Sequence, residues 1–137
     1  MGLILDSSVL IAAERQDQTV HRILADIYHS QGDIEVGISV ITVAELAHGV
    51  SRSGTSQRKE RRLLFMHELA TAIPVYDVTA AIAFQAGFVD GECQSKGVRL
   101  PLADLLIGVT ALELGFGVGT SNLRHFGLIP GLAVTQI

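Results

Sequence analysis

Short apolar runs alternate with longer amphipathic segments along the whole chain. The runs are rich in β-branched residues and end at polar residues or glycine, which is typical of buried strands. The longer segments repeat apolar residues every three to four positions, as helices do. We predict strands over residues 2–5, 36–41, 73–76, 117–120 and 132–134. We predict helices that begin just after Asp6 and at Thr42, and helices over 19–29, 58–70, 79–95 and 101–114.

This alternation of strands and helices predicts an α/β fold. A central, mostly parallel sheet of about five strands should carry helices on both faces. No repeat, low-complexity tract or linker divides the sequence, so we expect residues 1–137 to form a single domain. Pro74 places the third strand near an edge or a strand start. The pattern leaves the order of the strands open.

Composition limits the partners and the cellular compartment that we expect for the protein. The hydrophobic content is 48% with no Trp, which predicts an aliphatic core and favours a surface covered by a second copy, so we expect a homodimer. The net charge of −4 argues against general attraction to nucleic acid, so any such contact must be a local patch or a metal ion. Cys93 is the only cysteine, which excludes an internal disulfide and fits the cytoplasm.

No membrane segment is expected either. Asp6 interrupts the first apolar run, so the N-terminus does not have the pattern of a signal peptide. The most apolar stretch, residues 100–119, contains Asp104 and Glu113, and carboxylates are costly inside a lipid-exposed helix. We therefore predict a cytoplasmic protein without a membrane partner.

Three acidic residues recur in one local setting. Asp6 follows the first predicted strand, and Glu45 and Asp104 lie in the first turns of two predicted helices. Strand ends and the starts of the following helices lie at the same edge of a parallel sheet, so the three carboxylates could converge. Clustered carboxylates repel one another unless a divalent cation neutralises them, and Mg²⁺ or Mn²⁺ suits an all-oxygen site.

Each acid also has a structural interpretation. Thr42 and Glu45 match a capping box, in which Glu45 would only accept a backbone N–H. Asp104 near a helix N-terminus is favourable through the helix dipole, and Asp6 could be an N-cap. Spacing alone leaves the structural and the metal-binding interpretations open.

Four segments change this balance. They are residues 3–11 (LILDSSVLI), 41–46 (ITVAEL), 102–107 (LADLLI) and 120–126 (TSNLRHF). In this order, over nearly the whole chain, they resemble the PIN-domain ribonucleases, and most closely the VapC toxins of bacterial toxin–antitoxin pairs.

The resemblance implies a metal-dependent endoribonuclease. Asp6, Glu45 and Asp104 would be catalytic and bind Mg²⁺, with Mn²⁺ able to substitute. A metal-activated water would attack the phosphate and leave 5′-phosphate and 3′-hydroxyl ends. The substrate would be cellular RNA of the tRNA or rRNA class, and a cognate antitoxin protein would neutralise the toxin.

Asn122 occupies a position where family members commonly have a fourth acid or an Asn. As a fourth metal ligand it would add a carbonyl oxygen but no charge, which lowers the expected affinity for a second ion. It also fits a cap or turn residue. Ser7, Ser8 and Thr120 are expected to support the site by donating hydrogen bonds to Asp6 or to water; helix capping and strand propensity are the alternatives for them.

Five of the ten basic residues form the only basic cluster, at Arg52, Arg58, Lys59, Arg61 and Arg62. The last four are candidate RNA-binding residues, since phosphate contacts position nucleic acid without reading its sequence. The intervening Glu60 favours a solvated helix face instead. His125 either meets a phosphate or is a surface residue. The other histidines lie on separate helices without the spacing of zinc ligands.

Two other classes of function compete with the nuclease. One is a PIN-like binding module for RNA or antitoxin whose site is too weak to cut, for which Asn122 is the main support. The other is a phosphoryl-transfer domain with Asp6 as nucleophile. Such a domain would have a second Asp two residues later, but this position is Ser8, so this class ranks last. A divalent-metal titration separates the nuclease from the binding module.

Overall fold

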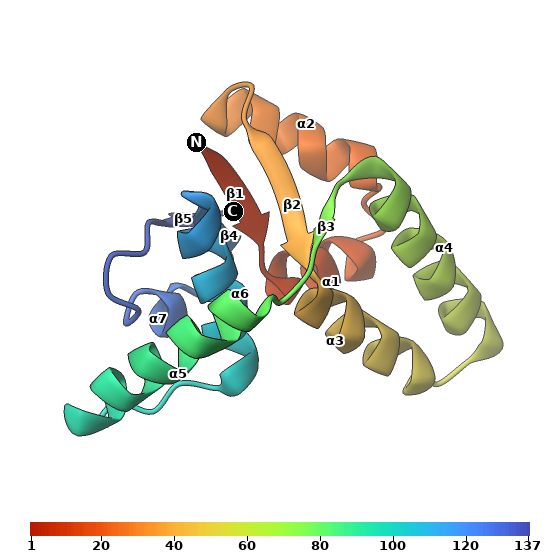
Figure 1. The fold of residues 1–137 in the computed structure, drawn as a ribbon. Helices are drawn as coiled ribbons and strands as arrows, with labels where there is room; N and C mark the ends of the chain where they lie inside the picture. The colour runs from red at the N-terminus through yellow and green to blue at the C-terminus, as the bar shows by residue number, and fades with distance from the viewer.

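All 137 residues are described by the computed structural model, which shows a five-stranded parallel sheet between two layers of helices (Figure 1). The elements are β1 (Gly2–Leu5), α1 (Ser7–Arg15), α2 (Val20–Gln31), β2 (Glu35–Ser39), α3 (Val40–Ser51), α4 (Ser56–Ala72), β3 (Val75–Tyr76), α5 (Ala80–Ser95), α6 (Leu102–Leu114), β4 (Gly117–Thr120), α7 (Leu123–Phe126) and β5 (Val134–Gln136). Every strand pair is parallel. The predicted α/β fold is therefore confirmed.

The core lies on both faces of β1, whose side chains alternate across the sheet. Leu3 and Leu5 join one apolar cluster with the buried residues of α1, α2 and α4. Ile4 points the other way and packs with residues of α5, α6 and α7. Since every residue of β1 is buried, the strand is apolar throughout, as parallel strands covered on both faces are.

The strand order is β3-β2-β1-β4-β5, which makes the carboxyl ends of β1 and β4 the place where a crevice of an open α/β sheet is expected. The chain leaves β1 toward β2 on one side, and β4 lies on the other, so this is the point where the strand order reverses. Ligands of open α/β sheets bind outside the carboxyl ends of the strands at such a point. Leu5 pairs with Gly119, and the N–H of Asp6 donates to the Gly119 carbonyl at 2.9 Å. Asp6 and Thr120 therefore emerge side by side.

The second strand is shorter than predicted, and this changes the interpretation of Glu45. The strand ends at Ser39, whose hydroxyl caps α3 by accepting from the Ile41 N–H at 3.1 Å. Thr42 is fully buried within α3, and its hydroxyl oxygen has no hydrogen-bond partner. The predicted capping box is therefore wrong. Glu45 lies in the second turn of the helix, where no orphan backbone N–H needs it.

Other boundaries shift by a few residues. Thr55 caps α4, which begins before the predicted position 58, and the last strand lies at Val134–Gln136 instead of 132–134. The short helix α7 was not predicted, because four residues are too few to show a helical period. Thr79 caps α5, which ends at Ser95 as predicted. None of the helices combines the length and the apolar character that a membrane crossing requires.

Candidate active site

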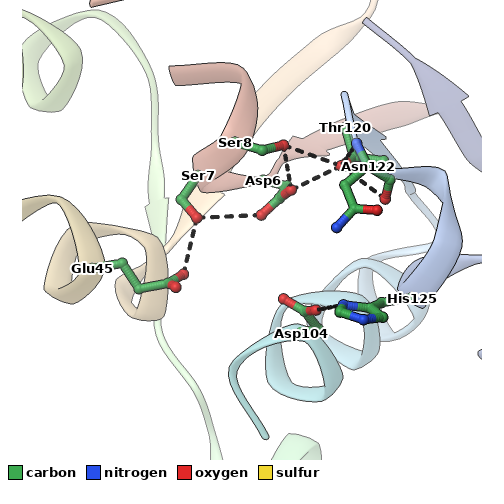
Figure 2. A network of polar contacts seen from close by, with 8 residues as sticks. All are labelled: Asp6, Ser7, Ser8, Glu45, Asp104, Thr120, Asn122 and His125. Carbon is green, nitrogen blue, oxygen red and sulfur yellow. Dashed lines mark hydrogen bonds and ion pairs between the residues drawn. The ribbon is translucent and has the colours of Figure 1, made fainter. Parts of the chain in front are cut away.

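Asp6 is the centre of a hydroxyl network at the crevice between β1 and β4 (Figure 2). The hydroxyl groups of Ser8 and Thr120 donate to its Oδ2 at 2.6 and 2.8 Å, and the Ser7 hydroxyl lies 3.4 Å from its Oδ1. The side chain is almost fully buried. The network therefore holds the Asp6 carboxyl in one orientation.

The side chain of Asp6 does not cap the helix, as the structural interpretation of this residue would require. Asp6 occupies the N-cap position of α1, with extended backbone, yet its side chain makes no capping hydrogen bond. Its oxygens accept from hydroxyl groups that come from α1 and from the end of β4. These hydroxyl groups therefore orient the Asp6 carboxylate, and the carboxylate takes no part in capping the helix.

Glu45 is linked to Asp6 through Ser7. The Ser7 hydroxyl lies 3.1 Å from Glu45 Oε1, so that the first turn of α1 contacts both carboxylates. Glu45 remains open to solvent on one side. Partial burial nevertheless raises the pKa of its carboxyl; the Ser7 hydrogen bond lowers it, and the charges of Asp6 and Asp104 raise it further.

Asp104 approaches from the opposite layer of helices, in the first turn of α6. Its Oδ2 accepts from His125 Nδ1 at 2.7 Å (Figure 2). Burial raises the pKa of the Asp104 carboxyl, the hydrogen bond from His125 lowers it, and the charge of Asp6 raises it. His125 is therefore an orienting partner of Asp104. From the sequence alone, His125 could also have been a surface residue. The short helix α7, which was not predicted, places His125 against Asp104 of α6.

The three acids interact through their charges. Asp6 and Asp104 both raise the pKa of Glu45, and no Lys or Arg forms an ion pair with any of the three. No group of three or more acidic, His or Cys side chains is close enough to enclose one ion by itself. The donor set still fits Mg²⁺, because this ion keeps several waters and is usually bound through one or two carboxylates.

Asn122 extends beside Asp6, on the side of the crevice that faces Asp104 and His125 (Figure 2). It occupies the N-cap position of α7, but its side chain makes no capping hydrogen bond. Its backbone N–H donates to the Thr120 hydroxyl at 2.9 Å, and Thr120 in turn donates to Asp6. The backbone of Asn122 therefore supports the Asp6 network, while its exposed amide is left without a partner in the chain.

The basic residues 58–62 lie at the start of α4. Arg62 donates to the Gly49 carbonyl at 2.8 Å and pairs with Glu14, and Arg61 pairs with Asp17 at 3.2 Å. These two side chains tie α4 to α1 and to the end of α3. Arg58 and Lys59 are exposed and form no ion pair. Arg62 also lines a pocket together with Glu45, between α1, α3 and α4, so the cluster borders the acidic site on the Glu45 side.

The contact between His125 and Asp104 yields a testable prediction. The family resemblance implies that Asp104 is a metal ligand of a ribonuclease, so His125→Ala should lower metal-dependent RNA cleavage by about ten- to a hundredfold because that ligand loses the partner that orients it. The pKa of Asp104, followed by NMR, should rise when the hydrogen bond is removed. His125→Asn should recover much of the activity, since its amide nitrogen can replace Nδ1, and His67→Ala on α4 is the control. Unchanged activity and an unchanged Asp104 pKa would remove His125 from the site.

Comparisons with known proteins show the family to which this fold belongs. The sequence model of the PIN domain matches residues 3–127. The chain is 32% identical to "Ribonuclease VapC2" of Rickettsia felis over 98 residues, which is 71% of this chain and 70% of that protein. It is 32% identical to "tRNA(fMet)-specific endonuclease VapC" of Salmonella typhimurium over 97 residues, 71% of each chain.

A solved structure extends the likeness to the whole fold. It is the DNA-bound VapBC complex of Salmonella typhimurium, of which one chain is matched with a TM-score of 0.82 and 26% identity. The match covers 99% of this chain and 98% of that chain. With the model of the domain spanning most of the sequence and the acids gathered at one sheet edge, the chain belongs to the PIN domain family.

Proposed function

We propose that this protein is a divalent-metal-dependent endoribonuclease, the toxin of a toxin–antitoxin pair. The observation that carries the proposal is the gathering of Asp6, Glu45 and Asp104 at the ends of β1 and β4, where no Lys or Arg forms an ion pair with any of them. The charge of Asp6 contributes to the raised pKa of both Glu45 and Asp104. Relatives named as VapC ribonucleases support the activity. The ion is Mg²⁺, with Mn²⁺ able to substitute, since both prefer oxygen ligands.

Each residue of the proposed site has a separate role. Asp6, held by Ser8 and Thr120, presents a fixed carboxylate, while Glu45 and Asp104 complete the acidic wall from α3 and α6. Asn122 adds a neutral oxygen ligand. When bound, the ion would activate a water for in-line attack on the phosphate and offset charge on the leaving oxygen. No side-chain nucleophile is needed, and the products would carry 5′-phosphate and 3′-hydroxyl ends.

The substrate class and the partner follow from the relatives. One of them is named a tRNA(fMet)-specific endonuclease, and several structural neighbours are VapBC complexes, some bound to DNA. For this chain we propose cleavage of structured cellular RNA, of the tRNA or rRNA class, and neutralisation by a cognate antitoxin protein.

A metal titration tests the proposed function. RNA cleavage should be absent in chelator and should appear on addition of Mg²⁺ or Mn²⁺, and the thermal midpoint should rise with the same concentration dependence because the folded state binds the ion. The products should be substrates for enzymes that require a 5′-phosphate. RNA binding without any metal-dependent cleavage would instead favour a PIN-like binding module, the second candidate, for which the neutral Asn122 is the support.

Asn122→Asp extends the same titration. The variant adds a fourth carboxylate beside Asp6, so the thermal stabilisation by Mn²⁺ and the cleavage activity should both reach their half-maximum at a lower Mn²⁺ concentration. The control Asn122→Ser keeps a polar side chain without adding charge. If the aspartate leaves both metal dependences unchanged, Asn122 takes no part in metal binding.

The basic cluster provides a separate prediction about RNA. Arg58 and Lys59 are free of ion pairs, so the double variant Arg58→Gln/Lys59→Gln should weaken binding to unrelated RNA sequences and flatten the salt dependence. Each lost phosphate contact should remove about 0.7 units from the log–log slope for single-stranded RNA. Arg22→Gln, on α2, is the control for general charge. An identical slope in the double variant would assign Arg58 and Lys59 to a solvated face.

A further inference from the structure

A cleft lies beside the acidic site, on the face of the sheet that α1 and α2 cover. It has a volume of about 430 Å³ and is formed by α1, α2 and the carboxyl end of β5. Its floor includes the buried aliphatic side chains of Val9, Ala13 and Ile23. A concave site of this size with an apolar floor is typical of small-molecule binding, and the proposed catalysis leaves it without a role.

The cleft is continuous with the Asp6 network through Ser121. The Ser121 hydroxyl, in the cleft wall, donates to the Ser8 hydroxyl at 2.9 Å, and Ser8 donates to Asp6 Oδ2 at 2.6 Å (Figure 2 shows the second contact). Gln136, another wall residue, is the register partner of Thr120, whose hydroxyl also donates to Asp6. The cleft wall therefore begins two hydrogen bonds from the Asp6 carboxylate, so an RNA whose phosphate lies at the acids has a neighbouring nucleotide at the cleft.

The wall carries neutral amides and no positive charge. The side chains of Gln16, Gln18 and Gln136 line it and form no hydrogen bond within the chain. No Lys or Arg lines the cleft, and its one acid, Asp26, is paired with Arg22 at 3.2 Å. This lining is unsuited to a phosphate, which binds basic side chains or helix N-termini. It suits a neutral ring with polar groups at its edge.

A nucleobase is a ring of this kind. Its faces can lie on aliphatic side chains, and its edge presents both hydrogen-bond donors and acceptors. A glutamine amide matches such an edge, because it has two N–H donors and one carbonyl oxygen. Sequence-specific recognition of RNA uses unstacked bases whose edges are hydrogen-bonded by the protein.

From these observations we infer that the cleft is a nucleobase subsite, which takes the base of an unpaired nucleotide next to the scissile phosphate. The ring lies on Val9 and Ile23, and the glutamines hydrogen-bond its edge. The inference rests on the proposed ribonuclease function for its substrate. It makes Gln16 and Gln136 specificity-determining residues, which help to select where the RNA is cut without touching the reacting atoms.

An NMR titration of the metal-free protein tests the subsite without relying on cleavage. The probes are the four 5′-mononucleotides AMP, GMP, CMP and UMP. At least one should shift the side-chain amide signals of Gln16, Gln18 and Gln136, with millimolar affinity because a single nucleotide makes few contacts. Ribose 5-phosphate, which lacks a base, should leave these signals unchanged. Equal shifts with ribose 5-phosphate, or no shift with any of the four mononucleotides, overturns the inference.

Cleavage kinetics give an independent test. Gln16→Ala/Gln136→Ala should raise KM about tenfold at an unchanged kcat, because base binding positions the RNA but takes no part in the chemistry. Ala12→Phe, which fills the cleft from α1, should raise KM at least as much. Gln31→Ala is the matched control, since Gln31 is exposed at the end of α2 and does not line the cleft. An unchanged KM in both cleft variants contradicts the subsite.

RNA oligonucleotides with one abasic nucleotide identify the base that fills the cleft. Abasic substitution at one position beside the cut should lower kcat/KM of the wild type about tenfold and have little further effect in Gln16→Ala/Gln136→Ala, because the two changes remove the same contact. Equal losses in the wild type and the double variant would show that the base lies elsewhere. If mononucleotides bind but the wild type cuts no RNA with any metal, the ribonuclease function is wrong while the base site stands.

Discussion

Asp6→Asn should lower RNA cleavage by more than about a hundredfold at matched Mg²⁺, since loss of a metal ligand should exceed the effect of losing one of its supporting partners. The carboxylate is the centre of the hydroxyl network and the acid nearest the sheet. Asparagine keeps its size, and the hydroxyl groups of Ser8 and Thr120 can rotate to suit an amide. The fold should therefore persist, and the thermal midpoint without metal should hold or rise because one negative charge is removed.

The control for this variant is Asp33→Asn, which removes one exposed carboxylate from the loop between α2 and β2. It should cleave RNA at the wild-type rate. Circular dichroism of both variants checks the fold, and a thermal titration with Mg²⁺ should show reduced stabilisation only for Asp6→Asn. Near wild-type cleavage by Asp6→Asn would be incompatible with the proposed metal site.

Glu45→Gln should lower cleavage about a hundredfold or more and, without metal, stabilise the fold at neutral pH. The pKa of the Glu45 carboxyl is raised in the folded protein, so the folded state holds its proton more tightly than the unfolded chain does. The stability that goes with this proton is present below the unfolded pKa and is lost as the pH rises through the folded value. Glutamine is neutral throughout and does not incur that loss.

The stability difference between Glu45→Gln and the wild type should therefore shrink as the pH falls below about 4.5, the ordinary value for a glutamate. Denaturant unfolding of metal-free protein at neutral and acidic pH measures it, with Glu68→Gln, an exposed position on α4, as the control. Full activity together with a pH-independent difference in stability would reduce Glu45 to a surface residue.

The sequence was sufficient for the elements whose apolar pattern and caps agree. The strand before Asp6 and the helix ends at Ser95 and Leu114 lie where predicted. The start of α3 was misplaced because Val40 and Ile41 are β-branched, which favours a strand, while the tertiary structure uses them in a helix that Ser39 caps. Strand order could not be predicted, because local patterns carry no information on which strands pair.

The candidate site could be predicted only in part, again because local patterns do not show which distant segments come into contact. The positions of Asp6 and Asp104 follow from strand and helix boundaries that the pattern marks well. The contact between His125 and Asp104 spans two elements, one of which is a single helical turn, so it depends on how α7 packs on α6. The division of the basic cluster into paired and free side chains likewise depends on Glu14 and Asp17 in a distant segment.

The pairing of β1 with β4 sets the order in which the site can assemble while the chain is being made. Asp6 and Thr120, whose hydroxyl holds the Asp6 carboxyl, are separated by 114 residues. Until β4 pairs with β1, β1 lacks one of its two neighbours and Asp6 lacks the Thr120 hydroxyl. The site therefore forms only after the segment that carries β4 has left the ribosome, so a growing chain that holds β1 to α6 has all three acids but not the completed site.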